Sequence, residues 1–423
     1  MKAIITVGMG FGDEGKGSCV DFLVREFHAD LVVRYNGGHQ AAHHVVLPGG
    51  REHTFSQFGS GTLAGVRTYL GRNVIIEPMA LEKEAEALTK LGIYRPKDKL
   101  SINEDCLVTT AWHRFLNQAK ELARGGDKDG SCGVGIGETR KYWLDYGDDS
   151  ITAKDLVDYS GLVKKLELVR QRMLLAVTEV HREAKRDDED ILDLMKAMHN
   201  LRSADVARRL VRGIEGVVIT NLMPRFDTAI FEGAQGILLD EYYGFYPHTT
   251  WSTTTSRHAF EELQGLDVDI TTLGIIRAHA SRHGAGPLPT ELVNLAFDEK
   301  SNPYNPWQGR MRYGNFDLPL ATYAKQVDGN IDGFFMTHND NQVKNICSGY
   351  MVRGSKYPHD TDGLARSPSL VDQEENGIYL DNVVVGLTNN LNALAALSSI
   401  GPVIAVSDGP TWKDKAIIKR DRI

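Results

Sequence analysis

The stretch whose residues are best suited to chemistry lies near the N-terminus, at residues 10–18, GFGDEGKGS. It joins an apolar segment, which predicts a strand, to a helix-like segment, so its backbone N–H groups and a helix N-terminus can surround an anion. Gly10 and Lys16 have P-loop spacing, but Gly17 stands where a P-loop has the Ser or Thr that holds magnesium. A metal would need another ligand, and Asp13 is the nearest acid. The alternative is a tight turn in which the glycines only supply unusual dihedrals.

A second polar loop, residues 34–44, follows a predicted strand and carries His39, His43 and His44. A zinc site is disfavoured because no Cys or acidic ligand lies close by in the sequence. A histidine that acts as an acid near neutral pH fits the loop better. Histidines that only hydrogen-bond the backbone of a tight loop are the remaining alternative.

Four further segments carry polar groups beside predicted strands or glycines. Residues 232–236 have the sequence EGAQG. Arg310 and Arg312 lie two apart in a glycine-flanked loop, which suits two carboxylates or a carboxylate and a phosphate. Asp340 follows another strand, where its carboxylate could accept two hydrogen bonds from the N–H edge of a guanine. Residues 246–255 are rich in hydroxyls, which could bind a phosphate or sugar or could only cap a β-edge.

The pattern of elements predicts an α/β fold with a predominantly parallel central sheet flanked by helices. Ligands bind such sheets at the carboxyl ends of the strands, so we expect one cleft to collect the polar loops. We expect one domain over residues 1–423, with an inserted helical subdomain at residues 152–214, where apolar residues recur every three or four positions. Residues 191–212 predict one helical segment within it. Residues 125–140 are too glycine-rich for a regular element.

Composition limits the classes of function. The formal charge of −8 argues against a broad nucleic-acid surface, which needs clustered Lys and Arg. Four separated cysteines favour reduced thiols over a disulfide framework or zinc site. The N-terminus has no signal pattern, and no apolar run approaches the roughly 18 residues that span a bilayer. We therefore expect a soluble, cytoplasmic protein with no membrane or nucleic-acid partner.

Taken together, five motifs closely resemble those of the adenylosuccinate synthetase family. They occur in the family's order and span nearly the whole chain, at residues 12–17, 37–43, 231–240, 284–291 and 309–312. The resemblance implies a ligase that joins L-aspartate to the 6-position of a purine nucleotide, converting IMP, aspartate and GTP into adenylosuccinate, GDP and phosphate. A 6-phosphoryl intermediate, Mg²⁺ as cofactor and a homodimer are also implied.

The resemblance further implies roles for individual residues. Asp13 would remove the N1 proton of the purine, His43 would be the acid that assists phosphate transfer, and Gln235 would position the purine. The nucleoside triphosphate would be bound by Gly12, Glu14, Gly15, Lys16, Gly17, His338, Asp340, Gly409 and Pro410. The acceptor nucleotide would be bound by Asp13, Gln40, Ser131, Cys132, Gln235, Thr250 and Arg310. Arg310 and Arg312 would hold aspartate, and Asp13 and the backbone of Ala42 would hold the metal.

The sequence also departs from the family pattern, which marks a divergent member. Cys132 replaces a Thr expected at the acceptor's monophosphate, Gln40 replaces an Asn, His338 replaces a Lys, and Trp307 and Gln308 replace a Thr pair. Residues 142–149 contain no Arg, although the family supplies one there to the partner subunit's monophosphate. Losing such a contact is worth roughly 1.5–3 kcal/mol, enough to change the preferred acceptor. Arg140 and Lys141 are the nearby cations that could compensate.

Three hypotheses follow. The chain could use IMP, or it could act on another 6-oxopurine nucleotide, such as GMP or dGMP to give 2-aminoadenylosuccinate, with GTP or ATP as donor. The related phage enzymes tend to carry a small residue in place of the loop acid, so Asp13 argues against the guanine case. A regulator without catalysis is the third hypothesis, and Asp13, His43 and Gln235 argue against it.

Overall fold

A ten-stranded sheet organises the chain in the computed structural model, which describes residues 1–125, 131–184, 189–297, 302, 304, 309–352, 383–389 and 391–423. The strands are β1 (Lys2–Gly8), β2 (Leu31–Arg34), β3 (His43–Val46), β4 (Glu52–Phe55), β5 (Arg67–Leu70), β6 (Ile75–Ile76), β7 (Leu100–Asn103), β8 (Leu107–Val108), β9 (Val218–Thr220), β10 (Thr228–Glu232), β11 (Asp269–Arg277), β12 (Ala280–His283), β13 (Met311–Gly314), β14 (Phe316–Asp317), β15 (Gly333–Thr337), β16 (Ile346–Val352), β17 (Val383–Thr388), β18 (Val403–Ser407) and β19 (Lys415–Ile417).

The helices that cover the sheet and its loops are distributed along the whole chain. They are α1 (Lys16–Glu26), α2 (Pro78–Lys90), α3 (Ala111–Arg124), α4 (Ile136–Tyr146), α5 (Tyr159–Glu183), α6 (Glu189–Asn200), α7 (Ser203–Gly213), α8 (Arg257–Glu262), α9 (Leu318–Asp328) and α12 (Ala393–Ile400).

The sheet has the strand order β19-β18-β15-β11-β1-β10-β2-β5-β7-β9, and every neighbouring pair is parallel except β18 and β19. Its centre is β1, whose apolar side chains Ala3, Ile4, Ile5 and Val7 are fully buried. Continuous apolar strands of this kind are typical of parallel sheets that are covered on both faces. The predicted fold class is therefore confirmed.

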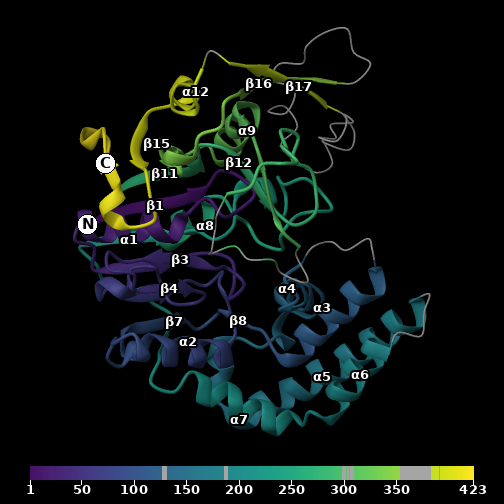
Figure 1. The fold of residues 1–423 in the computed structure, drawn as a ribbon. Helices are drawn as coiled ribbons and strands as arrows, with labels where there is room; N and C mark the ends of the chain where they lie inside the picture. Colours follow the sequence, from purple (N-terminus) through teal and green to yellow (C-terminus); the bar gives the residue numbers. More distant parts are fainter. Residues whose placement is uncertain are drawn as a thin grey trace.

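The parallel arrangement brings the predicted functional loops to one edge of the sheet. Neighbouring parallel strands end on the same side, so the loops that follow β1, β2, β10, β15 and β18 all leave from the carboxyl edge. These loops contain Asp13, Gln235, Asp340 and Gly409, and His43, which was expected in a loop, begins β3 directly after the loop that follows β2. Figure 1 shows the two chain ends close together, on the side of the molecule that carries α1 and β18.

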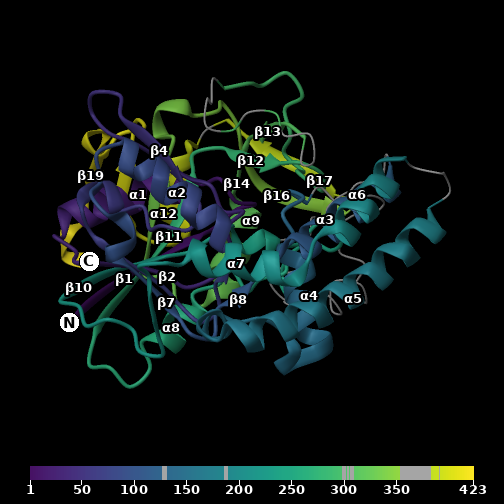
Figure 2. The ribbon, with the colours of Figure 1, turned by 90° about the horizontal axis from the view of Figure 1, so that it is seen from below.

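The predicted helical insertion at residues 152–214 consists of α5, α6 and α7, which lie at the bottom of Figure 1. Figure 2 shows the long α5 projecting away from the central strands beside α6. The buried Leu162 and Leu210 belong to one apolar cluster with Ile102 of β7, and the insertion packs against α2 and α3. The single helix predicted over residues 191–212 is wrong, because α6 ends at Asn200 and α7 begins at Ser203. The division into one domain with an inserted subdomain stays a prediction.

Two other sequence predictions are corrected. Part of the glycine-rich stretch 125–140 is helical, since α4 begins at Ile136 after the left-handed Gly135 and buries Ile136, Thr139 and Tyr142. Arg312 lies in β13, which pairs antiparallel with β12, although a loop was expected there.

Within the described parts of the chain, no helix is long and apolar enough to cross a membrane. Trp307 and Gln308, which stand where the family has a Thr pair, lie outside the described residues.

Candidate active site

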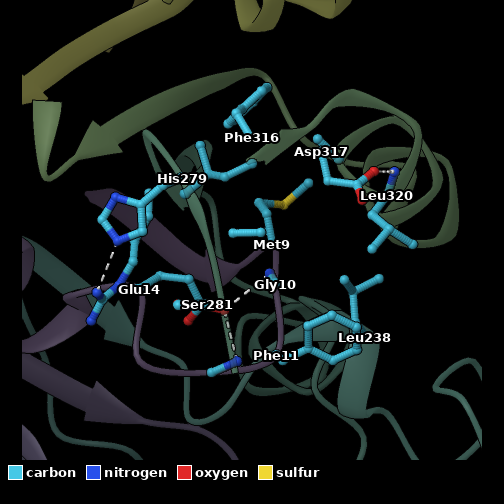
Figure 3. A pocket seen from close by; sticks show the side chains of 15 residues that line it. Met9, Gly10, Phe11, Glu14, Leu238, His279, Ser281, Phe316, Asp317 and Leu320 are labelled. Carbon is cyan, nitrogen blue, oxygen red and sulfur yellow. Dashed lines mark hydrogen bonds between the residues drawn. The ribbon is translucent and has the colours of Figure 1, made fainter. Parts of the chain in front are cut away.

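The loop between β1 and α1 is held in shape by its own Glu14. The loop turns through left-handed conformations at Gly12, Asp13 and Gly15, with φ values of 85°, 60° and 83°. Glu14 Oε1 accepts hydrogen bonds of 2.9 Å from the backbone N–H groups of Gly10 and Gly12, as Figure 3 shows for Gly10. Glu14 Oε2 forms an ion pair with Lys16, and both side chains are buried. The loop therefore contains an internal anion, and Lys16 is fixed beside it.

Asp13 lies at the tip of this loop with 27% of its side chain exposed. Its backbone carbonyl accepts a 2.6 Å hydrogen bond from Arg277 Nε, and its Oδ2 is 3.9 Å from His283 Nδ1. Burial raises the pKa of Asp13, although Arg277 and His283 oppose the shift. A raised pKa makes a carboxylate a better proton acceptor, which is the property of a general base.

His43, the first residue of β3, is paired with a buried acid of β10. Its Nδ1 hydrogen-bonds Glu232 Oε1 at the end of β10, and Ser60 donates to the same carboxylate through its N–H, at 2.9 Å, and through its hydroxyl. Burial opposes ionisation of Glu232, but His43, Arg34 and Ser60 together bring its pKa to about 2. Burial lowers the pKa of His43, and Glu232 opposes that shift. A carboxylate in this position fixes the imidazole and stabilises its protonated form.

The roles of Glu232 and Ser60 were not predicted from the sequence. Glu232 was noticed only as part of the EGAQG motif, and its position directly at the end of a buried strand was the available signal. Ser60 lies far from both partners in the sequence and carried no signal.

Gln235 lies where the loop after β10 meets the loop after β1. It has a left-handed φ of 61°, its Nε2 donates to Thr250 Oγ1 at 2.8 Å, and its Oε1 is buried without a partner among the described residues. Leu238 N donates to Gly10 O at 3.1 Å, which joins the two loops. Asn36 accepts from Ala234 N at 2.7 Å and donates to Thr253 O at 2.9 Å. Asn36 is thus a further positioning residue, which the sequence analysis missed.

Of the other residues predicted for the acceptor, Ser131 and Cys132 precede α4, and Gln40 lies between β2 and β3. Ser131 Oγ accepts a hydrogen bond of 3.0 Å from Asn117 Nδ2. Burial raises the pKa of Cys132 to about 11, so this thiol is neutral at physiological pH. Gln40 Oε1 is buried without a hydrogen bond among the described residues. Unpaired amide oxygens at Gln40 and Gln235 are what a site that awaits a polar ligand would show.

The two arginines predicted to hold aspartate have different surroundings. Arg310 is exposed just before β13. Arg312 pairs with Glu291 and donates from Nη1 to the carbonyl oxygens of Gly284 and Gly286 at 3.0 and 2.7 Å. Arg312 therefore fastens the loop between β12 and β13, and a bound carboxylate would have to share its guanidinium with Glu291.

The residues predicted at the nucleotide base lie beside the loop after β1, because Thr337 Oγ1 donates to Glu14 O at 2.7 Å and a Cβ added to Gly15 would lie 3.7 Å from His338 Cε1. His338 is left-handed, with φ of 52°, and Asp340 is exposed in the short 3₁₀ turn Asn339–Asn341. Asn339 Nδ2 donates to Asp408 Oδ1 at 2.7 Å, which ties this turn to the loop after β18. The buried Lys415, the first residue of β19, donates to Gly409 O of that loop at 3.2 Å, and Pro410 beside Gly409 is exposed.

The chain's own donors for a metal are few. Asp13 offers one carboxylate at the loop tip, and Ala42 is exposed beside His43. No group of three His, Cys, Asp or Glu side chains suited to a metal occurs among the residues that the structure describes. This donor set fits Mg²⁺, which keeps several waters and binds one or two carboxylates together with substrate phosphates.

A small cavity of about 40 Å³ lies behind the loop, lined by Met9, Phe316 and Asp317 (Figure 3). Its volume suits a few water molecules and not a nucleotide. Burial raises the pKa of Asp317 to about 7, against hydrogen bonds from Tyr350 OH and Leu320 N. The cavity lies against the loop, and Gly12 and Glu14, two of the residues predicted to bind the nucleoside triphosphate, line part of it.

Comparisons with known proteins agree on one family. A family model described as adenylosuccinate synthetase matches residues 5–375. An adenylosuccinate synthetase from Mycobacterium marinum is 31% identical over 446 aligned residues, covering 100% of this chain and 99% of the relative. One from Neisseria meningitidis serogroup C is 33% identical over 445 residues, covering 99% and 98%.

Two solved structures share the fold at 18% identity. A fully ligated adenylosuccinate synthetase from Plasmodium falciparum superposes with a TM-score of 0.74, covering 99% of this chain and 100% of that chain. The cyanophage S-2L succinoaminodeoxyadenylate synthetase (PurZ), bound to dGMP and to dATP as an energy donor, superposes with a TM-score of 0.60, covering 98% and 95%.

Proposed function

Because the chain belongs to the adenylosuccinate synthetase family of ligases, we propose that it joins L-aspartate to the 6-position of IMP with GTP as phosphate donor. The observation that carries the proposal is the His43–Glu232 pair, set on the same sheet edge as Asp13 and Lys16. These residues supply an acid, a base and a phosphate-binding cation at one site. Such a set suits phosphoryl transfer to O6 of a purine, because O6 becomes a nucleophile once N1 of the ring has lost its proton.

The first step phosphorylates the purine. Asp13 accepts the N1 proton, the electron pair moves to O6, the O6–P bond forms, and the bond from the γ-phosphorus to the bridging oxygen breaks. Negative charge develops on that bridging oxygen, and His43 stabilises it by donating a hydrogen bond or proton. Glu232 stabilises the protonated imidazole. In the second step the amino group of aspartate attacks C6, the C6–O6 bond breaks, and the leaving phosphate carries away the proton that the amine loses.

Mg²⁺, when bound by Asp13 and the Ala42 carbonyl with the phosphates, would neutralise the charge on the transferred group. Lys16 and the loop amides would hold the triphosphate, Asp340 would select guanine beside Gly409, and Gln235 would position the purine. Arg310 and Arg312 would hold aspartate. A homodimer in the cytoplasm, as the resemblance implies, completes the proposal.

A second candidate acceptor is a guanine nucleotide, GMP or dGMP, with GTP or ATP as donor. It is favoured by the neutral thiol of Cys132 at the predicted monophosphate position and by the fold shared with the cyanophage enzyme that binds dGMP. The acid at position 13 argues for IMP.

One assay tests the proposal. Purified protein is mixed with L-aspartate, Mg²⁺, GTP or ATP, and IMP, GMP or dGMP, and both phosphate and the aspartyl product are quantified. Phosphate release with formation of adenylosuccinate from IMP supports it. Turnover confined to GMP or dGMP would select the second candidate, and no turnover with any acceptor would contradict both.

A further inference from the structure

A cavity of about 510 Å³ adjoins the predicted acceptor site, and the steps of the proposed reaction do not use it. Its volume is in the range of small-ligand sites. Gly37 and Ser252 line it, and Gly37 N donates to Ser252 Oγ at 3.3 Å. A Cβ added to Gly37 would lie 3.8 Å from Gln235 Oε1, and Ser252 follows Thr250 closely in the sequence. The cavity therefore lies close to Gln235, which would position the purine, although Gln235 itself does not line it.

The cations in the cavity wall differ in how firmly they are paired. Lys154 forms a 3.0 Å ion pair with Asp105, and Lys165 forms one of 2.9 Å with Asp155. Arg140 on α4 lies 3.9 Å from Glu241, beyond hydrogen-bond distance. Its Nε is buried and has no hydrogen-bond partner among the described residues.

Other polar groups in the wall are also unpaired. Ser150 is 4% exposed, and its hydroxyl has no partner within the described parts of the chain. Asn73 Nδ2 and His258 Nδ1 are likewise buried and have no hydrogen-bond partner among the described residues. Buried donors without partners are rare and costly, so several in one cavity indicate a polar ligand.

Arg140 is also held in place for binding. Its guanidinium lies over the Trp143 ring, 4.6 Å from the centroid, while the Nε–H stays available. Its neighbour Lys141 forms an exposed ion pair with Asp145 at 2.9 Å. Arg140 and Lys141 are the two cations close in sequence to residues 142–149, where the family has an arginine and this chain has none. Of these two, Arg140 lines the cavity and Lys141 does not.

We propose that this cavity receives the phosphorylated end of the acceptor nucleotide and that Arg140 of the same chain binds its phosphate. The inference rests on the proposed function, because it takes the acceptor to be a purine nucleotide at Gln235. A planar guanidinium matches phosphate oxygens in a bidentate manner, which a neutral Cys132 thiol cannot do. The phosphate contact would then require no arginine from a partner subunit.

The test compares ligands that differ only in the phosphate. Binding of IMP and inosine, and of dGMP and deoxyguanosine, is measured by calorimetry for the wild type, Arg140→Met, Arg140→Lys and Lys141→Met. Arg140→Met should weaken binding of the preferred nucleotide about 10- to 100-fold and leave its nucleoside unchanged. Arg140→Lys should restore part of the loss, and Lys141→Met, which removes the same charge from the next residue, should bind like the wild type.

Equal weakening of nucleotide and nucleoside by Arg140→Met, or no weakening of the nucleotide, would overturn the proposal. A wild type that binds nucleotides no better than nucleosides would overturn it as well. Because binding is measured without turnover, these outcomes are distinct from failure of the proposed ligase reaction, which the absence of phosphate release alone would reveal.

Discussion

Gly17 and His43 are packed so closely that no side chain fits between them. A Cβ added to Gly17 would lie 2.8 Å from His43 Cβ and 2.9 Å from its carbonyl carbon. The first turn of α1 is therefore pressed against the residue that would act as the acid. This contact gives a physical reason for the departure from the P-loop pattern, because a Ser or Thr at position 17 would displace His43.

Replacing Gly17 by Ala should accordingly impair catalysis more than folding. We expect kcat for phosphate release to fall at least about 10-fold because His43 must move, a displacement of the kind that costs orders of magnitude in rate. Alanine is favoured over glycine in a helix by about 1 kcal/mol, which offsets part of the strain. Steady-state kinetics and thermal unfolding measure the two effects. Ser18→Ala is the control, and an unchanged kcat in Gly17→Ala would show that the contact is not needed.

Replacing Glu232 by Gln should lower activity and alter its pH dependence. The Glu232 carboxylate opposes the burial that lowers the pKa of His43, so a neutral amide should lower this pKa further. A reaction that needs protonated His43 is lost as pH rises through that pKa. The alkaline limb of the kcat profile should therefore move to lower pH, with kcat reduced about 10- to 100-fold. A variant with reduced kcat and an unmoved profile would assign Glu232 a purely structural role.

Replacing Asp13 by Asn tests the base without changing the backbone. Asp13 has φ of 60°, a conformation that Asn adopts readily and Ala does not. We expect phosphate release to fall at least about 100-fold, with the midpoint of thermal unfolding unchanged. Asp13→Ala should abolish transfer and leave the fold intact. Substantial turnover by either variant would refute the assignment of Asp13 as the base.

Replacing Asp317 by Asn should stabilise the protein at alkaline pH. Burial raises the pKa of Asp317 to about 7, while an unfolded Asp titrates near 3.9. Asp317 therefore keeps its proton to a higher pH in the folded protein than in the unfolded protein. As a result, the free energy of unfolding falls by up to about 4 kcal/mol as pH rises from about 4 through 7. Asn keeps the cap on α9 without the charge.

Urea unfolding at several pH values measures this effect. The gain in unfolding free energy from Asp317→Asn should be largest at pH 8 and shrink toward pH 4. Asp227→Asn, at an exposed aspartate, should show no such trend. A gain that does not depend on pH would mean that Asp317 has the same pKa in the folded and in the unfolded protein.

The sequence by itself determined the fold class and the loops that carry function. Apolar runs such as residues 3–7 read as buried parallel strands because both faces of the sheet are covered, and β1 lies at the sheet's centre. Local patterns also predicted the helical insertion that contains α5, whose apolar spacing is a property of consecutive residues. The motif at residues 12–17 could be recognised in the same way, because it is contiguous.

Only the tertiary structure decided which distant groups meet and what each side chain is already bound to. Glu232 and His43 are separated by 189 positions, and strand order brings them into contact. Arg312 and Arg140 look alike in sequence, yet the first is held by Glu291 and the second faces a cavity. The helix at α4 formed despite its glycines because Ile136 and Tyr142 are buried against other parts of the chain. Long-range packing sets these contacts, and no local pattern of residues encodes them.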